Sequence, residues 1–327
     1  MRRGDPLFVT GATGFIGQHL VAELVERGER VRALVRGEGP APGGAEPVRG
    51  DLRQVEALAP ALAGCRAVIH AAALLDPITD AAAAERVNVQ ATVALARAAQ
   101  RAGVGCFVHL SSIAAIGLRD IRGLVGPRTP CRPARESIYG QSKRAAELAL
   151  LGLEHSGMRL VILRPPTVYG VGEQRNFLAL TRAVATGLFV VPGRGDNRIS
   201  FCHVGNLTSA VRFVAEEPRA EGVLHVADET APTLREMTSL IGAGLGRRPL
   251  PLPFPLPVAW LVALALELGC RPLGRTPPLS RSRLRTLTGR FVLDGSALRA
   301  LGWRPPVTVA AGVRETVDWY RAERLLR

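Results

Sequence analysis

A tyrosine and a lysine lie four residues apart in the stretch Tyr139-Gly140-Gln141-Ser142-Lys143. On a helix this spacing puts both on one face, one turn apart, so that an ammonium group lies beside a phenol. A phenol titrates near ~10 and a neighbouring cation favours its anion, so the pair can transfer a proton near neutral pH. Lys143 is the single lysine among 42 basic residues, the rest being arginine. Arginine's planar fork does not imitate a compact ammonium, which favours a specific role for Lys143. Taken alone, the pair is equally typical of a solvated surface helix.

A glycine-rich turn near the start of the chain predicts a dinucleotide site. The apolar run Leu7–Thr10 leads into Gly11-Ala12-Thr13-Gly14-Phe15-Ile16-Gly17, and a helical pattern follows to Gly28. Strand, glycine turn and helix form the context in which this motif binds a pyrophosphate. The helix N-terminus would add partial positive charge for the phosphates. We expect the cofactor contacts to come from Gly11, Thr13, Gly14, Phe15, Ile16 and Gly17.

The next strand bears on the choice of cofactor. It is expected over 30–35 and ends at Arg36, about 20 residues after the glycines, where such a fold meets the adenosine ribose. An acid at this position would bind the 2′-hydroxyl of NAD, whereas an arginine accommodates the 2′-phosphate of NADP. Arg36 therefore favours NADP, with NAD as the alternative. The competing interpretation is one more solvated arginine in an arginine-rich chain.

Apolar strands continue to alternate with helices, which predicts a doubly wound parallel sheet of the α/β class. Strands are expected over 46–49, 67–70, 106–110 and 159–163, with a long helix over 81–101 and the Tyr139 helix running to about Ser156. Ligands gather at the carboxyl ends of such strands. The residues that follow these ends and the long helix supply the remaining candidates: Asp51 and Leu52, Ala71, Ala72 and Ala73, Asn88, and Ser111 and Ser112.

Composition narrows the possible functions. The 327 residues carry a net charge of +14, which suits anionic partners such as nucleotide phosphates, although a general arginine bias explains it as well. Aromatic residues make up only 5%, which disfavours a base-stacking nucleic-acid platform. Five cysteines and six histidines show no metal spacing, so no metal is expected. Free thiols and the absence of a signal-peptide pattern predict a cytoplasmic protein.

The C-terminal part is less regular. Residues 117–137 are expected to form a loop, and the pattern Thr233-Leu234-Arg235-Glu236 predicts a capping box. Val258–Leu268 is an almost unbroken apolar helix, too short to span a bilayer. A core helix is the favoured interpretation; the alternatives are an apolar substrate pocket or contact with a membrane surface. Asp294 and Thr308 are expected to cap two further helices.

Together these motifs resemble the extended short-chain dehydrogenase/reductase family. The matching elements are Thr10–Gly17, Gly50-Asp51-Leu52, His70–Ala73, Asn88, Ser111-Ser112, Tyr139–Lys143, Arg164-Pro165 and Tyr169-Gly170. The resemblance implies a Rossmann domain over 1–170, to which 205–228 return, and a substrate-binding lobe from 171–204 and 229–327. It implies Tyr139 as general acid/base, Ser112 as the group that orients the substrate oxygen, Lys143 on the nicotinamide ribose, Asn88 in a proton relay, and Pro165 near the cofactor.

Two branches of the family remain open for the substrate, which is in either case a small molecule. Arg198 and Asn176 resemble the phosphate-holding residues of nucleotide-sugar epimerases. The apolar helix 258–268 and the arginine-rich segment after Pro278 look more like those of hydroxysteroid dehydrogenases and dihydroflavonol reductases. The epimerases usually have an acid where Arg36 stands, so an NADP-linked reductase of an apolar ketone is favoured. A non-catalytic dinucleotide sensor is the alternative from another class, disfavoured because such regulators generally lack the Tyr-x-x-x-Lys pair. The resemblance also suggests a homodimer paired through the helices that carry Asn88 and Tyr139.

Overall fold

The computed structural model describes residues 4–75, 80–117, 122–154, 156–187, 190–247, 252–270, 277 and 280–326. Its largest feature is a seven-stranded sheet in the order β11-β7-β5-β4-β1-β2-β3, in which every pairing is parallel. The strands are β1 (Leu7–Thr10), β2 (Val31–Val35), β3 (Glu46–Arg49), β4 (Ala67–His70), β5 (Cys106–Leu110), β7 (Arg159–Arg164) and β11 (Gly222–His225). The predicted doubly wound parallel sheet is confirmed.

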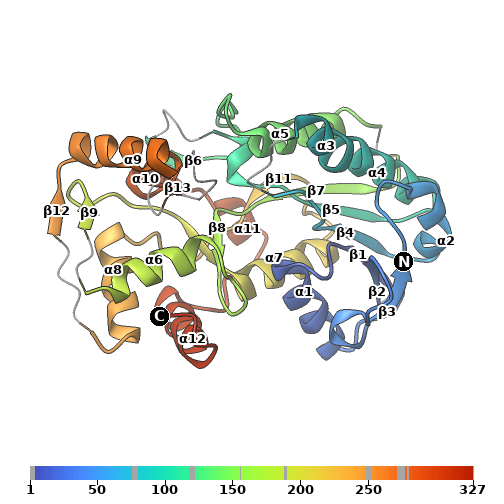
Figure 1. The fold of residues 1–327 in the computed structure, drawn as a ribbon. Helices are drawn as coiled ribbons and strands as arrows, with labels where there is room; N and C mark the ends of the chain where they lie inside the picture. The colour runs from blue at the N-terminus through green and yellow to red at the C-terminus, as the bar shows by residue number, and fades with distance from the viewer. Residues whose placement is uncertain are drawn as a thin grey trace.

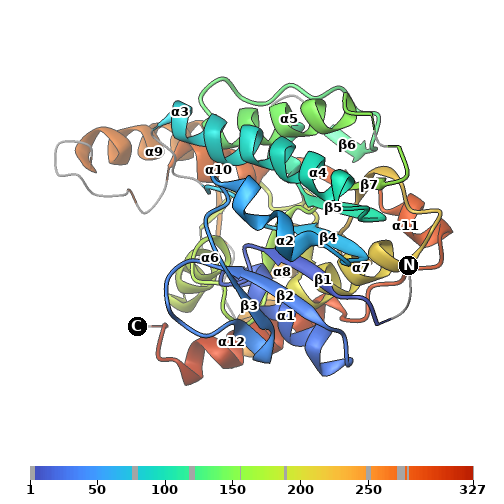
Figure 2. The same cartoon turned by 90° about the vertical axis from the view of Figure 1, so that its right-hand side faces the viewer.

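Helices cover both faces of this sheet (Figure 1). On one face, α1 (Phe15–Glu26) and α7 (Val204–Glu216) pack Leu20, Leu24 and Val211 into a core with alternate residues of β1 and β5. On the other face, α4 (Ala91–Arg101) and α5 (Ile138–Leu151) contribute Leu95 and Leu150 to a second core, together with the short α2 (Ala59–Leu62). Figure 2 shows α4 and α5 side by side above the strands. Burial on both faces explains why these strands are continuous apolar runs.

A second lobe packs beyond the carboxyl ends of the strands. Its core is formed by α6 (Asn176–Ala185), α8 (Leu234–Gly244) and α12 (Val309–Ala322), with buried Phe177, Met237 and Val313. Three parallel strand pairs surround it: β8 (Thr167–Tyr169) with β10 (Phe201–His203), β9 (Val190–Pro192) with β12 (Leu252–Phe254), and β6 (Arg122–Val125) with β13 (Arg290–Leu293). Three further helices lie in the C-terminal part of the sequence: α9 (Leu256–Cys270), α10 (Arg281–Thr288) and α11 (Ser296–Ala300).

Several local predictions are corrected. The expected loop 117–137 contains β6, whose partner β13 lies far away in the sequence. The expected helix over 81–101 is α3 (Ala81–Ala84), a π-helical segment (Glu85–Gln90) and α4 in succession. The Tyr139 helix ends at Leu151, earlier than predicted. Gly295 rather than Asp294 is the N-cap of α11, although the Asp294 carboxylate accepts a hydrogen bond from the Ser296 N–H. The Thr233 capping box and the Thr308 cap are confirmed.

The prediction that the helix 258–268 lies in the core is also wrong. The helix exists as α9, but only Ala259 and Ala263 are buried in it. Leu261 and Leu268 are 65% and 60% exposed. Among the described residues, no helix is long and apolar enough to cross a bilayer.

Candidate active site

The glycine turn between β1 and α1 is built around two very close backbone approaches. Gly11 has φ +71°, and a Cβ there would lie 2.6 Å from the Ala72 nitrogen. A Cβ on Gly17 would lie 2.0 Å from the Gly11 carbonyl oxygen. Both positions therefore require glycine, the first for its left-handed backbone and contact with the segment after β4, the second for contact between α1 and the turn.

This turn fits a dinucleotide pyrophosphate. The N-cap of α1 is Gly14, which offers no side-chain cap, and the first turn of α1 carries no acid. The helix dipole at this end is therefore not compensated by a carboxylate of its own first turn, and anions are stabilised there. Thr13 to Gly17 and Ala71 to Ala73, which follow β1 and β4 at the same sheet edge, are the residues that would hold the group.

Three arginines and one acid gather at the expected adenosine end. Arg36 follows β2 and is exposed, while the Arg53 guanidinium pairs with Asp51, the shortest Nη2–Oδ2 distance being 2.6 Å. This hydrogen bonding lowers the pKa of Asp51 to about 2, and the nearby charge of Arg36 contributes. The Asp51 carboxylate thus binds Arg53, and Leu52 beside it is buried. Arg49 donates to the carbonyls of residues 37, 38 and 39 and so fixes the loop after Arg36.

Lys143 is buried on α5. Its exposed fraction is 2%, and its Nζ donates to the Leu110 carbonyl at the end of β5, 2.7 Å away. Burial lowers the Lys143 pKa to about 8, against an opposing effect of the Glu147 carboxylate. The interpretation as a solvated surface lysine is therefore wrong. Tyr139 lies one turn earlier in the first turn of α5 and is half-buried.

Ser112 and α5 meet through the short helix Ile113–Ala115. Ser112 is the N-cap of that helix, its Oγ accepting from the Ala114 N–H at 3.1 Å. A Cβ on Gly140 would lie 2.7 Å from the Ala114 carbonyl oxygen, so the glycine between Tyr139 and Lys143 allows this approach. Pro165 closes the same region, its carbonyl accepting from the Ile113 N–H at 3.0 Å. The fold thus places the segment of Ser112 against the first turn of α5.

Asn88 connects the π-helical segment to α5. Its side chain is 1% exposed; it accepts from the Leu74 N–H at 2.7 Å and donates to the Leu74 carbonyl and to Ser142 Oγ at 3.1 and 2.9 Å. Ser142 Oγ in turn donates to the Tyr139 carbonyl at 2.9 Å. The π-helical distortion, a feature frequent at functional sites, therefore falls on a predicted site residue.

A buried histidine, which the sequence interpretation left without a role, joins the glycine turn to Asn88. The Thr92 hydroxyl donates its one hydrogen to the Asn88 carbonyl at 2.8 Å, so it accepts from His70 Nε2–H at 2.8 Å. His70 Nδ1 is then the unprotonated nitrogen and accepts from the Thr10 hydroxyl at 2.7 Å. Burial lowers the His70 pKa to about 3, which keeps the ring neutral. A single tautomer therefore links β1, β4 and the Asn88 segment.

Glu147 is the second residue that sequence reasoning missed. It is fully buried one turn after Lys143 and accepts from Arg164 through two bonds, from Ser111 Oγ and from Arg144. The available signal was its spacing of four from Lys143, together with the arginine of Arg164-Pro165. The pair of Glu147 and Arg164 joins α5 to the end of β7.

The two candidate phosphate-holding residues are not brought to the Tyr139 region by any described contact. Asn176 begins α6, and its backbone N–H donates to Glu173. The Arg198 guanidinium donates to the Ala231 carbonyl at 2.8 Å and lies 3.7 Å from Glu236, and its side chain is 57% exposed. Arg198 thus supports the capping box of α8 in this structure.

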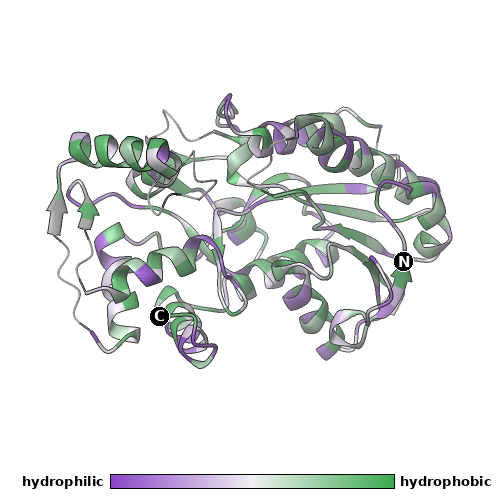
Figure 3. Cartoon of the chain, in the orientation of Figure 1, coloured by the Kyte–Doolittle hydropathy of each residue, from purple (hydrophilic) through white to green (hydrophobic). Residues whose placement is uncertain are grey.

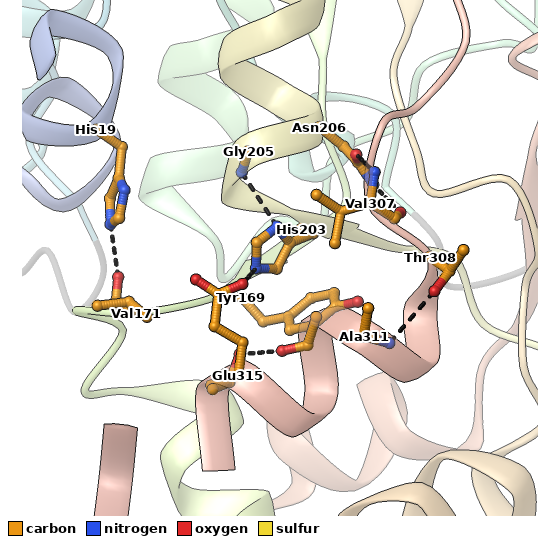
Figure 4. Close-up of polar contacts among 12 residues, drawn as sticks. His19, Tyr169, Val171, His203, Gly205, Asn206, Val307, Thr308, Ala311 and Glu315 are labelled. Atoms are coloured by element: carbon orange, nitrogen blue, oxygen red, sulfur yellow. Dashed lines mark hydrogen bonds and ion pairs between the residues drawn. The ribbon is translucent and has the colours of Figure 1, made fainter. Parts of the chain in front are cut away.

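A polar cluster joins the second lobe to the sheet domain (Figure 4). Asp228 accepts from Tyr169 Oη, from the His203 N–H and from Asn206, and burial raises its pKa to about 6. Figure 4 shows the His203 ring next to Tyr169 and to Glu315 of α12. His203 Nε2 lies 3.5 Å from Glu315 Oε2. These contacts fix β8 and β10 against α12 and α7, and so set the relative position of the two lobes.

Comparison with known proteins agrees with this arrangement. The profile of the NAD dependent epimerase/dehydratase family matches residues 7–227. The chain belongs to this family. The resemblance to extended short-chain dehydrogenase/reductases is thereby confirmed, and with it an enzyme family of NAD-dependent oxidoreductases and epimerases.

Its relatives differ in what they act on. A 4-hydroxy-2-methyl-3-oxo-4-farnesyl-3,4-dihydroquinoline-1-oxide ketoreductase of Stigmatella aurantiaca is 32% identical, with 94% of each chain covered. A UDP-glucose 4-epimerase of Vibrio cholerae is 31% identical, with 95% of this family member and 94% of the epimerase covered. The structure of MoeE5 in complex with UDP-glucose and NAD is similar, with a TM-score of 0.73, 28% identity, and 98% of this chain and 100% of MoeE5 covered.

Proposed function

We propose that this protein is an NADPH-dependent reductase of an apolar ketone, with Tyr139 as the general acid. The observation that carries the proposal is Lys143: a buried ammonium group on the helix of Tyr139, held by the Leu110 carbonyl at the strand end that leads to Ser112. Burying the chain's single lysine costs free energy, which a function at this point explains. A dinucleotide sensor has no need of such a group.

The chain's own residues supply position and a proton. A nicotinamide dinucleotide, when bound, supplies hydride to the carbonyl carbon. Ser112 Oγ orients the carbonyl oxygen and stabilises its developing charge, and the Tyr139 hydroxyl gives its proton to that oxygen. The Lys143 ammonium stabilises the resulting phenolate, and solvent returns the proton. Asn88 holds the first turn of α5 through Ser142, and the proposed proton relay passes along this side of the helix.

Two observations support the cofactor and the substrate class. Arg36 follows β2 in a loop that Arg49 fixes, and at the adenosine end the nearby acid Asp51 is held by Arg53. Positive charge there suits a 2′-phosphate. Relatives named for apolar substrates include the farnesyl-dihydroquinoline ketoreductase and a 3 beta-hydroxysteroid dehydrogenase/isomerase of Mycobacterium tuberculosis, 29% identical.

The second candidate is a nucleotide-sugar 4-epimerase, which the Vibrio cholerae relative and MoeE5 favour. The contacts of Arg198 with Ala231 and Glu236 weigh against it, because a phosphate-binding arginine would have to leave both.

The test begins with the cofactor. The purified protein is examined for retained dinucleotide, and the apo form is titrated with NADPH and NADH. We expect tighter and exchangeable NADPH binding, a preference that falls about tenfold or more in Arg36→Ala, and turnover of apolar ketones. Tyr139→Phe should keep NADPH binding and lose about 10²–10⁴-fold in rate. Retained NAD together with turnover of a nucleotide sugar would instead establish the epimerase, and a Tyr139→Phe variant with full activity would exclude the mechanism.

A further inference from the structure

The helix α9 buries small side chains and exposes several large apolar ones. The small residues Ala259 and Ala263 face inward and are 3% and 0% exposed. Four larger residues face solvent: Val258, Leu261, Val262 and Leu268 are 42%, 65%, 41% and 60% exposed. At spacings of three, four and ten from Val258 these residues form one stripe along the helix. A helix stabilised only by its own fold would bury the larger side chains.

The rest of the described fold does not cover this stripe. The cluster beneath α9 consists of Ala259, Ala263 and Leu284 of α10, with Phe254 and Trp260 at its margin. Figures 1 and 2 place α9 at the periphery of the molecule, and Figure 3 shows it apolar along its length. Contiguous exposed apolar surface of this kind marks an interaction site.

Charge identifies the kind of surface that fits. Glu267 is the one acid of α9, and its carboxylate is paired with the Arg281 guanidinium at 2.7 Å. In the sequence from Glu267 to Asp294 there are six arginines and no further acid between the two, within a chain of net charge +14. An apolar stripe on a helix that the sequence follows with an arginine-rich, acid-poor segment matches a layer that is apolar inside and anionic at its face.

We propose that α9 docks this protein on the surface of an anionic lipid bilayer, lying in the interface with the stripe Val258, Leu261, Val262 and Leu268 toward the acyl chains. The helix is 15 residues long, or about 22 Å, so it lies along the surface and does not cross the bilayer. Such contact would give the second lobe direct access to apolar molecules dissolved in the membrane. The proposal goes beyond the reductase assignment and does not depend on it.

Vesicle sedimentation of the full chain tests the proposal. The wild-type protein should sediment with vesicles of phosphatidylcholine and phosphatidylglycerol, and at least about tenfold less with phosphatidylcholine alone or at high salt. Leu261→Asp with Leu268→Asp should reduce binding to the mixed vesicles at least about tenfold. The control is Leu148→Asp with Leu151→Asp, which changes two leucines of α5 that are 54% and 46% exposed and adds the same charge. This control should bind like wild type.

A second measurement uses the unaltered helix. Vesicles with brominated acyl chains should quench tryptophan fluorescence of the wild type, and Trp260→Phe should remove most of that quenching. The proposal is overturned if the protein does not sediment with anionic vesicles, or if the α9 and α5 variants lose binding equally. It is also overturned if the α9 substitutions dissociate an oligomer in sedimentation equilibrium while lipid binding is absent, since the stripe would then be a contact between copies.

Discussion

Glu147 and Arg164 form a bidentate ion pair in the interior, with Nε–Oε1 at 2.7 Å and Nη2–Oε2 at 2.6 Å. Both side chains are at most 1% exposed. The pair links the helix of the catalytic candidates to the end of β7, and the Glu147 carboxylate raises the pKa of Lys143 against the effect of burial. One carboxylate therefore contributes both to the fold and to the charge of the site.

Removing this carboxylate should be costly. Glu147→Gln leaves the Arg164 cation buried with a neutral partner, so we expect a loss of about 3–5 kcal/mol in the free energy of unfolding. Urea denaturation measures it. The matched control is Glu56→Gln, whose partner Arg101 and own side chain are exposed, and which should cost less than about 1 kcal/mol. Equal losses in the two variants would show that the buried pair contributes no more than a surface one.

The rate should depend on the charge of Lys143. Its pKa of about 8 means that the ammonium is intact below that pH and lost above it, so kcat for ketone reduction should fall as pH rises through about 8. Lys143→Arg should have a lower rate whose falling limb has moved to higher pH, because guanidinium stays charged. A wild-type kcat that stays level to about pH 10 would contradict this assignment. The effect of Lys143 on stability has the opposite sign. Between a pH of about 8 and the ordinary lysine pKa of 10.5, this residue binds more protons in the unfolded chain than in the folded one. Its contribution to the free energy of unfolding therefore rises with pH over this range.

A methyl group on Gly17 should weaken dinucleotide binding at the proposed pyrophosphate site. Its Cβ would meet the Gly11 carbonyl oxygen at 2.0 Å, which α1 can relieve only by moving away from the turn. We expect Gly17→Ala to weaken NADPH binding at least about tenfold and to destabilise the fold by about 1–3 kcal/mol. Fluorescence titration and thermal melting measure the two effects. Gly126→Ala is the control, since a Cβ there meets nothing within 4 Å; unchanged NADPH affinity in Gly17→Ala would refute the close-packed turn.

Asn88 should act on the rate through the position of α5. Asn88→Ala removes the bonds to Leu74 and Ser142 and leaves the Leu74 N–H without its acceptor, so we expect about 1–3 kcal/mol of destabilisation. We expect kcat to fall at least about tenfold with KM little changed, because the first turn of α5 loses a support rather than a substrate contact. Gln90→Ala changes an exposed residue of the same π-helical segment and should leave both parameters unchanged. A higher KM with an unchanged kcat would instead indicate that Asn88 contacts the substrate directly.

Much of the sheet domain follows from the sequence. The bounds of β1, β4 and β5 coincide with the predicted ones, because fully buried strands appear as uninterrupted apolar runs between polar turns. The bounds of β3 also coincide, although this edge strand is largely exposed. The glycine turn was predictable from its motif between a strand and a helix. Of its two close approaches, that of Gly17 to the Gly11 carbonyl is local, whereas that of Gly11 to Ala72 depends on the packing of β4 beside β1. Strand β6 was not predictable, because Gly, Pro and Arg dominate the sequence around it and its partner β13 lies more than a hundred residues later.

The sequence by itself determined that Tyr139 and the one lysine share a face of one helix. It also determined that a glycine-rich turn typical of dinucleotide-binding folds follows the first strand. Only the tertiary structure decided that Lys143 is buried against Leu110, that Glu147 pairs with Arg164, and that His70 has a single tautomer. It also decided that the stripe Val258, Leu261, Val262 and Leu268 of α9 faces outward. Periodicity reveals that a face is apolar, whereas burial, ion pairing and pKa depend on which distant segment packs against that face.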